Sequence, residues 1–475
     1  MDFANLPAYL MRHQREGVFI GLRDKRHLYA NDTGTGKTVI GIELHRAINK
    51  KTLVVCPLSI IEPAWMTDLS RFYPETRAVN LWRESKRGTI KHKRVQRMKE
   101  EIKACDICIV NFESFRILQP LIEDGNFDVL MIDESSRVKN PKAKITKALI
   151  KYSDKVDYCF LFSGTPAPNT ELEYWTQVRM ISDVFGTSYW NFRGRYFFPT
   201  GYGGYTWKPI EHLVPDFRQR LASCSSAVTK EDVLDLPERL TMRRDIMLNT
   251  DERRAYKHML NNLYVLIEDE EVTAANAAVK CSKLRQISSG FIIGEHSSVI
   301  NLGNSKLSEL MDLLDDIGRR QVIIWTQFQH EASQIVKTMS EAGKPVGRID
   351  GTVPQRDKEL AIKCFKDGSL QYLVAHPRSM GHGQTLTNCT DMIYYSVSYS
   401  LEEYLQTRDR IYRYGQQNKC SYYFLIAKDT VEEAVMKAVA RKKDIAADVI
   451  DYIKAHGVKR GRPKRDARPV QRAGN

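Results

Sequence analysis

Short apolar runs, rich in β-branched and aromatic residues, recur through the first third of the chain. They occupy residues 27–32, 52–57, 107–112, 127–134 and 158–166. The polar stretches between them are long enough for a helix, and apolar runs of this length are typical of buried strands. Strands that alternate with helices in this way predict a parallel α/β sheet.

The same rhythm returns in the last third, which predicts a second α/β domain. Its apolar runs occupy residues 321–328, 346–351, 371–377, 391–397 and 421–427. Helical patterns dominate the region between the two domains, and we expect helical insertions there and not a third sheet. The expected division is a first domain at 1–170, helical insertions and linker with a protrusion of the first domain at 171–300, a second domain at 301–456, and a basic tail at 457–475.

The overall composition is that of an ordinary globular chain. Of the 475 residues, 42% are hydrophobic and 27% are charged, which argues against wholesale disorder and collagen-like repeats. No apolar stretch approaches the roughly 18 residues of a membrane span, and the N-terminus lacks the apolar core of a signal peptide. We therefore expect no membrane partner, and a cytoplasmic location in a bacterial or phage-infected cell or a nuclear one in a eukaryote.

Nine cysteines at irregular spacings favour free thiols in a reducing compartment over a disulfide framework. Cys105 and Cys108 form a CxxC, but they lie in an apolar run without a second Cys or His pair nearby. A buried strand is therefore a better interpretation than a zinc site. We predict no metal site built on cysteine.

Positive charge is concentrated in two segments. The chain has 72 Lys and Arg against 58 Asp and Glu, a net charge of +14, and residues 83–103 and 457–475 together hold +12 of it. Clustered charge on an otherwise balanced chain indicates a polyanion partner. Each cluster alone is equally compatible with a solvated helix face or a loose terminus.

A third unusual segment, residues 185–207, holds ten aromatic residues interleaved with arginine and glycine. Such a composition suits stacking on nucleic-acid bases. At this density aromatic residues more often form the core of a small subdomain, and we favour that interpretation.

A phosphate-binding loop follows the first apolar run. It consists of Gly34-Thr35-Gly36-Lys37-Thr38 and stands between a predicted strand and a predicted helix, as this motif requires. The glycines let backbone N–H groups close around phosphate, and the helix N-terminus adds partial positive charge. Lys37 would reach the β and γ phosphates of a nucleotide, and the Thr38 hydroxyl would bind magnesium. Asn31 replaces the first glycine of the usual GxxxxGK[ST] pattern.

An acidic pair, Asp133 and Glu134, ends the fourth apolar run. A nucleotide-driven motor needs a carboxylate linked to magnesium and a group that orients the attacking water. We assign the first role to Asp133 and the second to Glu134. An acidic pair at a strand end is usually a solvated turn, but its place downstream of the phosphate loop favours the catalytic interpretation.

Two arginines near the C-terminus, Arg410 and Arg413, are candidates for arginine fingers. The segment from Leu401 to Gln416 has a helical pattern, which would place both arginines on one face of a helix. Supplied from the second domain, they would stabilise charge on the γ phosphate only when the two domains close. The alternative is a surface helix in which they pair with Glu402, Glu403 and Asp409.

Taken in order, these motifs resemble those of the Swi/Snf-type ATPases of helicase superfamily two, which are DNA translocases. The resemblance covers nearly the whole chain and is carried by LMRHQREGV, NDTGTGKT, LVVCPLSIIEPAW, IVNFESF, MIDESSRVKNP, LFSGTPAPN, VLDLPE, SKLRQISSG, VIIWTQF, RIDGT, GHGQTLT and QTRDRIYRYGQ. It implies an α/β fold of two tandem RecA-like parallel-sheet domains with helical insertions between them. It also implies ATP and Mg as cofactors and double-stranded DNA as the partner. The compact length is similar to that of bacterial or phage-encoded members.

The resemblance also implies roles for individual residues. Gln14 would read adenine, Thr165 would couple the domains, Gly383 would lie near the nucleotide, and Gln406 would complete the closing site with the two arginines. Backbone contacts to DNA would fall at Ser59, Asn111, Thr326 and Gly351. Departures from the family pattern stand after the acidic pair and in the second domain, at Ser136, at Gln384 and Thr385, and at 398–400. They leave the nucleotide ligands intact and affect the expected coupling.

The basic tail has a second, smaller resemblance, because residues 459–465 (KRGRPKR) look like an AT-hook. An extended Arg-Gly-Arg-Pro lies flat in a narrow A·T-rich minor groove, where Arg460 and Arg462 would meet concentrated negative potential. The alternatives are an unstructured basic tail or a nuclear import signal.

Together these features predict an ATP-dependent translocase on double-stranded DNA whose contacts are mainly to phosphate. One alternative is a strand-separating DNA or RNA helicase of the same superfamily. An alternative of another class is a non-catalytic DNA-binding scaffold on a decayed motor fold. The intact Lys37, Thr38, Asp133 and Glu134 argue against decay.

Overall fold

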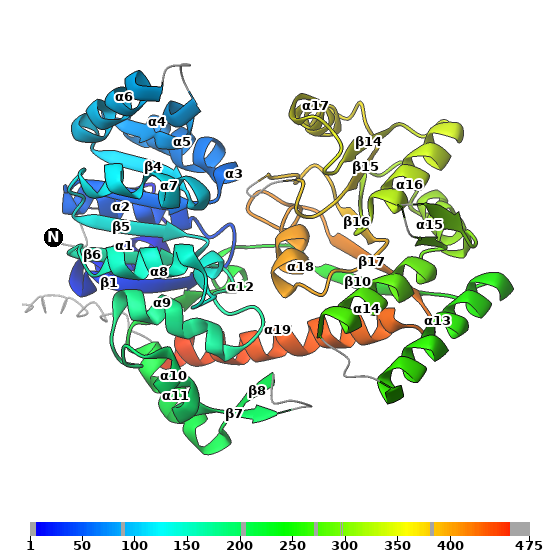
Figure 1. The fold of residues 1–475 in the computed structure, drawn as a ribbon. Coiled ribbons are helices and arrows are strands. Elements are labelled where there is room, and N and C mark those ends of the chain that lie inside the picture. Colours follow the sequence, from blue (N-terminus) through cyan, green and yellow to red (C-terminus); the bar gives the residue numbers. More distant parts are fainter. Residues whose placement is uncertain are drawn as a thin grey trace, which may run out of the picture.

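The computed structural model describes residues 6–86, 91–200, 206–269, 274–294, 296, 298–380 and 384–456. Two separate sheets dominate it, one in each half of the molecule (Figure 1). The tail, with Arg460 and Arg462, and the loop that contains Gly383 lie outside the described residues.

The first sheet has seven parallel strands in the order β3-β4-β2-β5-β6-β1-β9. Their bounds are Ala78–Asn80, Ile107–Asn111, Thr52–Cys56, Val129–Asp133, Tyr158–Phe162, Arg26–Asn31 and Ser225–Val228. The central strands β2 and β5 and their neighbour β4 are buried along their whole length, as expected of a parallel sheet with both faces covered. The apolar runs in the first third of the sequence are therefore sheet strands, as predicted.

Helices cover both faces of the first sheet. One face packs against α1 (Arg12–Asp24), α2 (Lys37–Ile48), a π-helical turn (Ile61–Met66) and α4 (Thr67–Phe72). The other face packs against α6 (Lys91–Ala104), α7 (Phe112–Glu123), α8 (Lys144–Ser153), α9 (Tyr174–Ile181) and α11 (Val214–Ala222). Short helices α3 (Leu58–Ile60), α5 (Leu81–Lys86), α10 (Tyr189–Tyr196) and α12 (Lys230–Val233) complete this half.

The second sheet has six parallel strands in the order β10-β17-β16-β13-β15-β14. Their bounds are Arg239–Ile246, Cys420–Ala427, Asp391–Tyr394, Val322–Trp325, Tyr372–Ala375 and Val346–Ile349. Helices α15 (Ser305–Ile317) and α16 (Gln329–Glu341) cover one face, while α17 (Gln355–Lys366) packs on the other. Helices α13 (Thr250–Asp269), α14 (Ala274–Ser288) and α18 (Leu401–Arg408) lie at its margins (Figure 1). The two parallel sheets confirm the predicted fold class.

The region 171–300 is not only helical. It supplies β9 to the first sheet and β10 to the second. The chain crosses from one domain to the other between these two strands, at 229–238. It also forms two antiparallel hairpins, β7 (Phe197–Thr200) with β8 (Thr206–Pro209) and β11 (Phe291–Ile293) with β12 (Val299–Asn301). The prediction missed β9 and β10 because their apolar patterns are weak: β10 alternates between exposed and partly buried residues along an outer edge.

The aromatic segment 185–207 forms a local core in its described residues at 185–200, as favoured above. Phe185, Phe192, Tyr196 and Phe197 are buried and pack around Phe217 of α11. Trp190 and Phe198 are exceptions on this segment, with 57% and 43% of their surfaces exposed. The nine cysteines are free thiols, and Cys105 and Cys108 lie buried at and just before β4.

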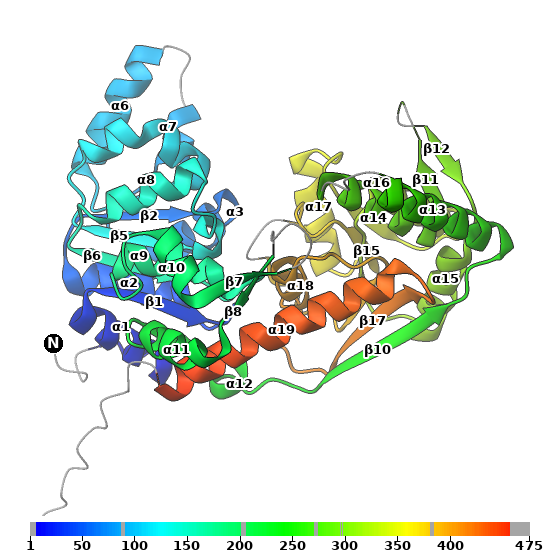
Figure 2. The same cartoon turned by 60° about the horizontal axis from the view of Figure 1, so that its bottom comes forward.

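A single long helix, α19 (Val431–His456), joins the two halves (Figure 2). Its first turns pack into the second-domain core through Val435, and its last turns pack into the first-domain core through Val449 and Ile453. Midway, the Lys442 ammonium donates hydrogen bonds to Asn169 Oδ1 at 3.1 Å and to a carbonyl of the second domain. The helix therefore ties both domains together along one side.

Candidate active site

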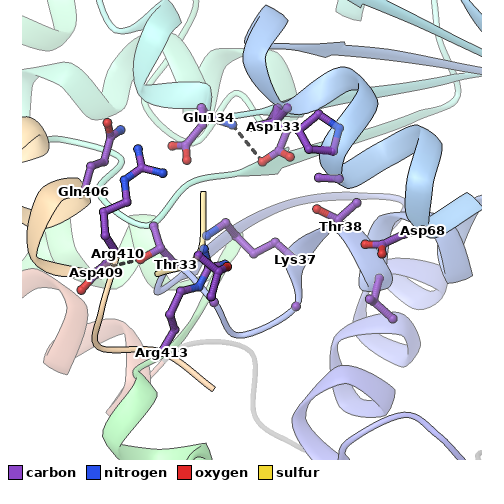
Figure 3. Close-up of a pocket in the computed structure, with 17 residues that line it drawn as sticks. Thr33, Lys37, Thr38, Asp68, Asp133, Glu134, Gln406, Asp409, Arg410 and Arg413 are labelled. Atoms are coloured by element: carbon purple, nitrogen blue, oxygen red, sulfur yellow. Dashed lines mark hydrogen bonds between the residues drawn. The ribbon is translucent and has the colours of Figure 1, made fainter. Parts of the chain in front are cut away.

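A cavity of about 320 Å³ lies between the two domains, at the carboxyl ends of the first-sheet strands. This edge is where open parallel sheets bind ligands. First-domain residues on its wall include the phosphate loop, Asp133 and Glu134, and second-domain residues include Thr385, Gln406, Asp409, Arg410 and Arg413 (Figure 3). The catalytic residues predicted from the sequence therefore meet in one place.

The phosphate loop leads from β1 into α2, which begins at Lys37. Gly34 and Gly36 have φ angles of 84° and 83°, a backbone conformation that residues other than glycine rarely adopt. A Cβ atom on Gly36 would also lie 2.2 Å from the amide nitrogen of Gln14, so this position needs glycine. The Lys37 ammonium donates hydrogen bonds to the carbonyls of Asn31 at 2.9 Å and Asp32 at 3.1 Å. The Lys37 ammonium must give up both hydrogen bonds before it can reach a phosphate.

The acidic pair lies on the opposite wall, where β5 ends. Asp133 is buried, and its Oδ1 accepts a hydrogen bond from the backbone N–H of Glu134 at 3.0 Å (Figure 3). Glu134 has φ of 56°, a strained left-handed conformation for a residue other than glycine, of a kind that often occurs at active sites. Burial raises the pKa of both carboxyls, that of Glu134 to about 7, and the nearby charge of Lys37 opposes this rise.

Side chains from both walls suit a magnesium ion. Thr38 and Asp133 line the same cavity and offer a hydroxyl and a carboxylate oxygen, the hard ligands that magnesium prefers. Magnesium in nucleotide sites is held by few protein ligands, with phosphates and water completing its shell. The described residues contain no group of three or more His, Cys, Asp and Glu that could hold a metal ion by themselves.

Arg410 and Arg413 face the first domain but do not lie on a helix. Helix α18 ends at Arg408, so the prediction of one helical face for both arginines is wrong. Tertiary hydrogen bonds hold the segment instead: the Arg410 carbonyl accepts from the Leu386 N–H at 2.9 Å, and the Gln416 amide donates to the Thr387 and Cys389 carbonyls, both at 3.1 Å. These bonds to neighbouring loops replace the helical ladder.

The two arginines nevertheless reach the phosphate loop. A Cβ atom on Gly34 would lie 3.5 Å from Nε of Arg413, so that side chain packs directly over the loop. Arg410 donates to the Gln384 carbonyl at 3.2 Å and is 5% exposed. Burial, followed by the charge of Arg413, lowers the pKa of Arg410 to about 10, and burial lowers the pKa of Arg413. Both groups remain cationic at neutral pH.

A buried ionic contact joins the domains beside these arginines. The Lys230 ammonium lies 2.6 Å from Asp409 Oδ1, and the Thr33 hydroxyl of the phosphate loop donates to the other oxygen of the same carboxylate (Figure 3). The backbone N–H of Lys230 also donates to Asp32 Oδ2 at 3.1 Å. Asp409 thus contacts two elements of the first-domain side while its chain neighbour Arg410 faces the cavity.

Comparison with known proteins decides the family. Residues 13–290 match the pattern described as the SNF2-related domain, and residues 305–415 match the helicase conserved C-terminal domain. The chain belongs to the SNF2-related family. With its two parallel sheets and the site between them, this SNF2-related chain is an ATPase of helicase type.

Curated relatives resemble the SNF2-related chain over most of its length. An uncharacterized ATP-dependent helicase of Mycoplasma pneumoniae is 25% identical over 456 residues, which are 93% of this chain and 42% of that protein. Putative protein p41 of Acyrthosiphon pisum secondary endosymbiont phage 1 is 24% identical over 445 residues, 89% of this chain and 93% of the phage protein. The chain therefore spans less than half of the first relative and nearly all of the second.

Among solved structures, a chain described as the Sulfolobus solfataricus SWI2/SNF2 ATPase core in complex with dsDNA is 20% identical to the SNF2-related chain. The similarity covers 96% of each chain, with a TM-score of 0.42. Among the described residues, no helix is both long and apolar enough to cross a membrane.

Of the remaining nucleotide-site predictions for the SNF2-related chain, only those within the described residues can be placed, and Gly383 is not among them. Gln14 is buried, accepts a hydrogen bond from the Met11 N–H at 3.0 Å and donates to the Thr35 carbonyl at 3.3 Å, so it braces the loop. Gln406 lines the cavity, and Thr165 lines a small adjoining pocket with Thr33 and Glu134.

A second cavity, of about 1450 Å³, spans both domains next to the first. Of the residues predicted to contact DNA, Ser59 lines it, while Asn111, Thr326 and Gly351 do not. Asn111 and Thr326 are buried, at the end of β4 and just after β13, and each has a buried side-chain oxygen without a hydrogen-bond partner in the described structure. Their roles in DNA contact remain predictions.

Sequence reasoning missed several residues of the site. Thr33, Asp68 and Asp409 line the nucleotide cavity, and Lys230 holds Asp409. Lys230 follows a weakly apolar strand nearly two hundred residues from the phosphate loop, so only the fold reveals its contact. Asp409 directly precedes Arg410, a candidate arginine finger, and this adjacency was a signal in the sequence that could have identified it as a site residue.

Proposed function

We propose that this chain is an ATP- and magnesium-dependent translocase on double-stranded DNA. The observation that carries the proposal is the placement of Arg413, from the second domain, over Gly34 of the phosphate loop in the first. Because the two halves of the site come from separate domains, hydrolysis depends on how closely those domains meet. A motor that cycles between open and closed states needs this dependence.

The chemistry follows from the positions of the side chains. Lys37 exchanges its loop carbonyls for the β and γ phosphates, and Glu134 orients the attacking water. Thr38 and Asp133 would hold magnesium, which supplies charge neutralisation on the phosphates when bound. Arg410 and Arg413 offset the charge that develops on the γ phosphate, and they do so only while the domains are closed.

The larger cavity is the proposed duplex site. Its wall carries Arg137 and Lys139 from the first domain and Lys358 and Arg378 from the second. Three of these cations form ion pairs with carboxylates: Glu113 lies 4.0 Å from Arg137, Glu402 lies 3.6 Å from Lys139, and Glu403 lies 2.5 Å from Arg378. Phosphates would compete for the same cations, so duplex binding opens the Lys139–Glu402 pair that links the domains across this cavity.

Contacts of this kind read the backbone and carry little sequence information. We propose that sequence preference comes instead from the tail, with Arg460 and Arg462 in an A·T-rich minor groove. The resemblance of KRGRPKR to an AT-hook supports this part of the proposal.

The test is ATP turnover by the purified chain without polymer and with duplex DNA, single-stranded DNA or RNA. We expect the greatest stimulation by duplex DNA, and displacement of a triplex-forming strand without separation of an ordinary duplex. Unwinding of a tailed duplex without triplex displacement would establish the strand-separating alternative. No turnover under any condition, with DNA binding intact, would establish the scaffold alternative.

A further inference from the structure

The π-helical turn Ile61–Met66 lies between the two cavities. Helices of this kind are rare and occur mostly as single turns, often at functional sites. Leu58, Ser59, Glu62 and Thr67, in or beside this turn, line the large cavity, whereas Ile60, Ala64 and Asp68 line the nucleotide cavity. Pro63 lines both. One short segment therefore separates the proposed duplex site from the nucleotide site.

Trp65 connects this turn to the acidic pair. Its side chain is fully buried, and its indole Nε1–H donates a hydrogen bond to Asp133 Oδ2 at 3.0 Å. The other oxygen of that carboxylate accepts the N–H of Glu134, so both oxygens have a fixed donor. Hydrogen bonds to an ionised carboxylate are stronger than neutral ones, and the two together set the plane of the group.

The position of the indole ring is itself fixed by close packing. A Cβ atom on Gly41 of α2 would lie 2.6 Å from Cη2 of Trp65 and 3.4 Å from Sδ of Met131. A glycine at this point of α2 therefore makes the space that the ring occupies. Any displacement of the π-helical turn must move the ring against α2 or lengthen its bond to Asp133.

We propose that Trp65 is a positioning residue that transmits occupancy of the duplex cavity to the magnesium-side carboxylate Asp133. This inference rests on the proposed function. DNA seated against Ser59 and Thr67 holds the outer face of the turn, and the turn holds the indole. The indole in turn holds Asp133 in the orientation that magnesium and nucleotide require. Trp65 touches neither substrate, so it acts through Asp133 alone.

The test compares two conservative substitutions of buried tryptophans. Trp65→Phe keeps a ring but removes the N–H donor. Trp325→Phe is the matched control, because Trp325 is equally buried and its Nε1–H meets only Met392 Sδ, at 3.4 Å in the second-domain core. For each variant, affinity for a fluorescent ATP analogue is measured with magnesium and with a chelator, and turnover is measured with and without duplex DNA.

We expect Trp65→Phe to reduce the magnesium-dependent gain in nucleotide affinity by about tenfold, since a hydrogen bond to a charged group is lost. Affinity in chelator should stay unchanged, and stimulation by duplex DNA should fall more than basal turnover. Gly41→Ala, which displaces the ring but keeps the N–H, should reproduce the loss of stimulation.

Equal behaviour of Trp65→Phe and Trp325→Phe, in a parent protein that does show magnesium-dependent affinity and duplex stimulation, would overturn the inference. So would a parallel loss of affinity with and without magnesium, which would mark Trp65 as a core residue only. A parent protein that lacks both responses would instead refute the proposed function itself.

Discussion

Lys230 and Asp409 form a buried ion pair between the domain crossover and the second domain, with 2.6 Å between Nζ and Oδ1. Asp409 precedes Arg410 and also accepts a hydrogen bond from Thr33 of the phosphate loop. Desolvation opposes both charges, while each partner holds the other in its ionised form. The pair fixes the distance between the phosphate loop and the segment that carries the two arginines.

Lys230→Met should therefore lower kcat by up to about 100-fold, because Arg410 and Arg413 are no longer held at the correct distance from the phosphate loop. The affinity for ATP should change little. Asp409→Asn should have a similar effect, and the double variant should be no worse than either single one. The measurement is steady-state turnover together with equilibrium nucleotide binding.

A matched control is Lys306→Met, which breaks the buried Lys306–Glu432 pair at 2.5 Å within the second domain. It should lower the unfolding temperature without changing turnover per folded molecule. If both lysine variants lose activity in proportion to lost stability, the Lys230 pair has no special role in positioning the arginines.

Lys37→Ala and Glu134→Gln should each abolish ATP turnover, because the proposed roles of these side chains are in phosphate chemistry and neither lines the large cavity. Duplex affinity should remain within about twofold of the parent, as measured by fluorescence anisotropy in the absence of nucleotide. Turnover close to that of the parent in either variant would remove the residue from the site.

Arg413→Ala should reduce turnover by about a thousandfold, the effect typical of a lost arginine finger, and should retain nucleotide binding. Arg319→Ala, an exposed arginine of the same domain, is the control and should leave both unchanged. Loss of ATP binding in Arg413→Ala, measured by calorimetry, would indicate that the guanidinium supports the loop through its packing over Gly34.

Deletion of residues 457–475 should flatten the salt dependence of DNA binding by several units at most, since each lost phosphate contact reduces the slope by about 0.9. It should also erase any preference for A·T-rich over G·C-rich duplex. Affinities for both duplexes across a salt series, with and without the tail, provide the measurement. An unchanged preference would exclude the minor-groove role, and an unchanged slope would exclude the tail from DNA contact.

The sequence predicted the features that depend on local pattern. Strand, loop and helix around Lys37 follow one another in the chain, so the phosphate loop and its flanking elements were readable, as was Asp133 at a strand end. The end of α18 at Arg408 could not be predicted, because a hydrogen bond from a distant loop competes there with a good helical pattern. Trp65 and Lys230 were missed for a related reason: the role of each is one contact with a carboxylate far along the chain.

The long helix α19 limits what kind of motion the two domains can make. It has 26 residues, about 39 Å at the usual rise, and its two ends are buried in different cores. A rigid rod anchored at both ends allows rotation about its own axis far more easily than separation along it. For the translocase proposed above, successive cycles would therefore retrace one arc, and the length of a step along DNA would be governed by the angle through which this rod permits the domains to turn.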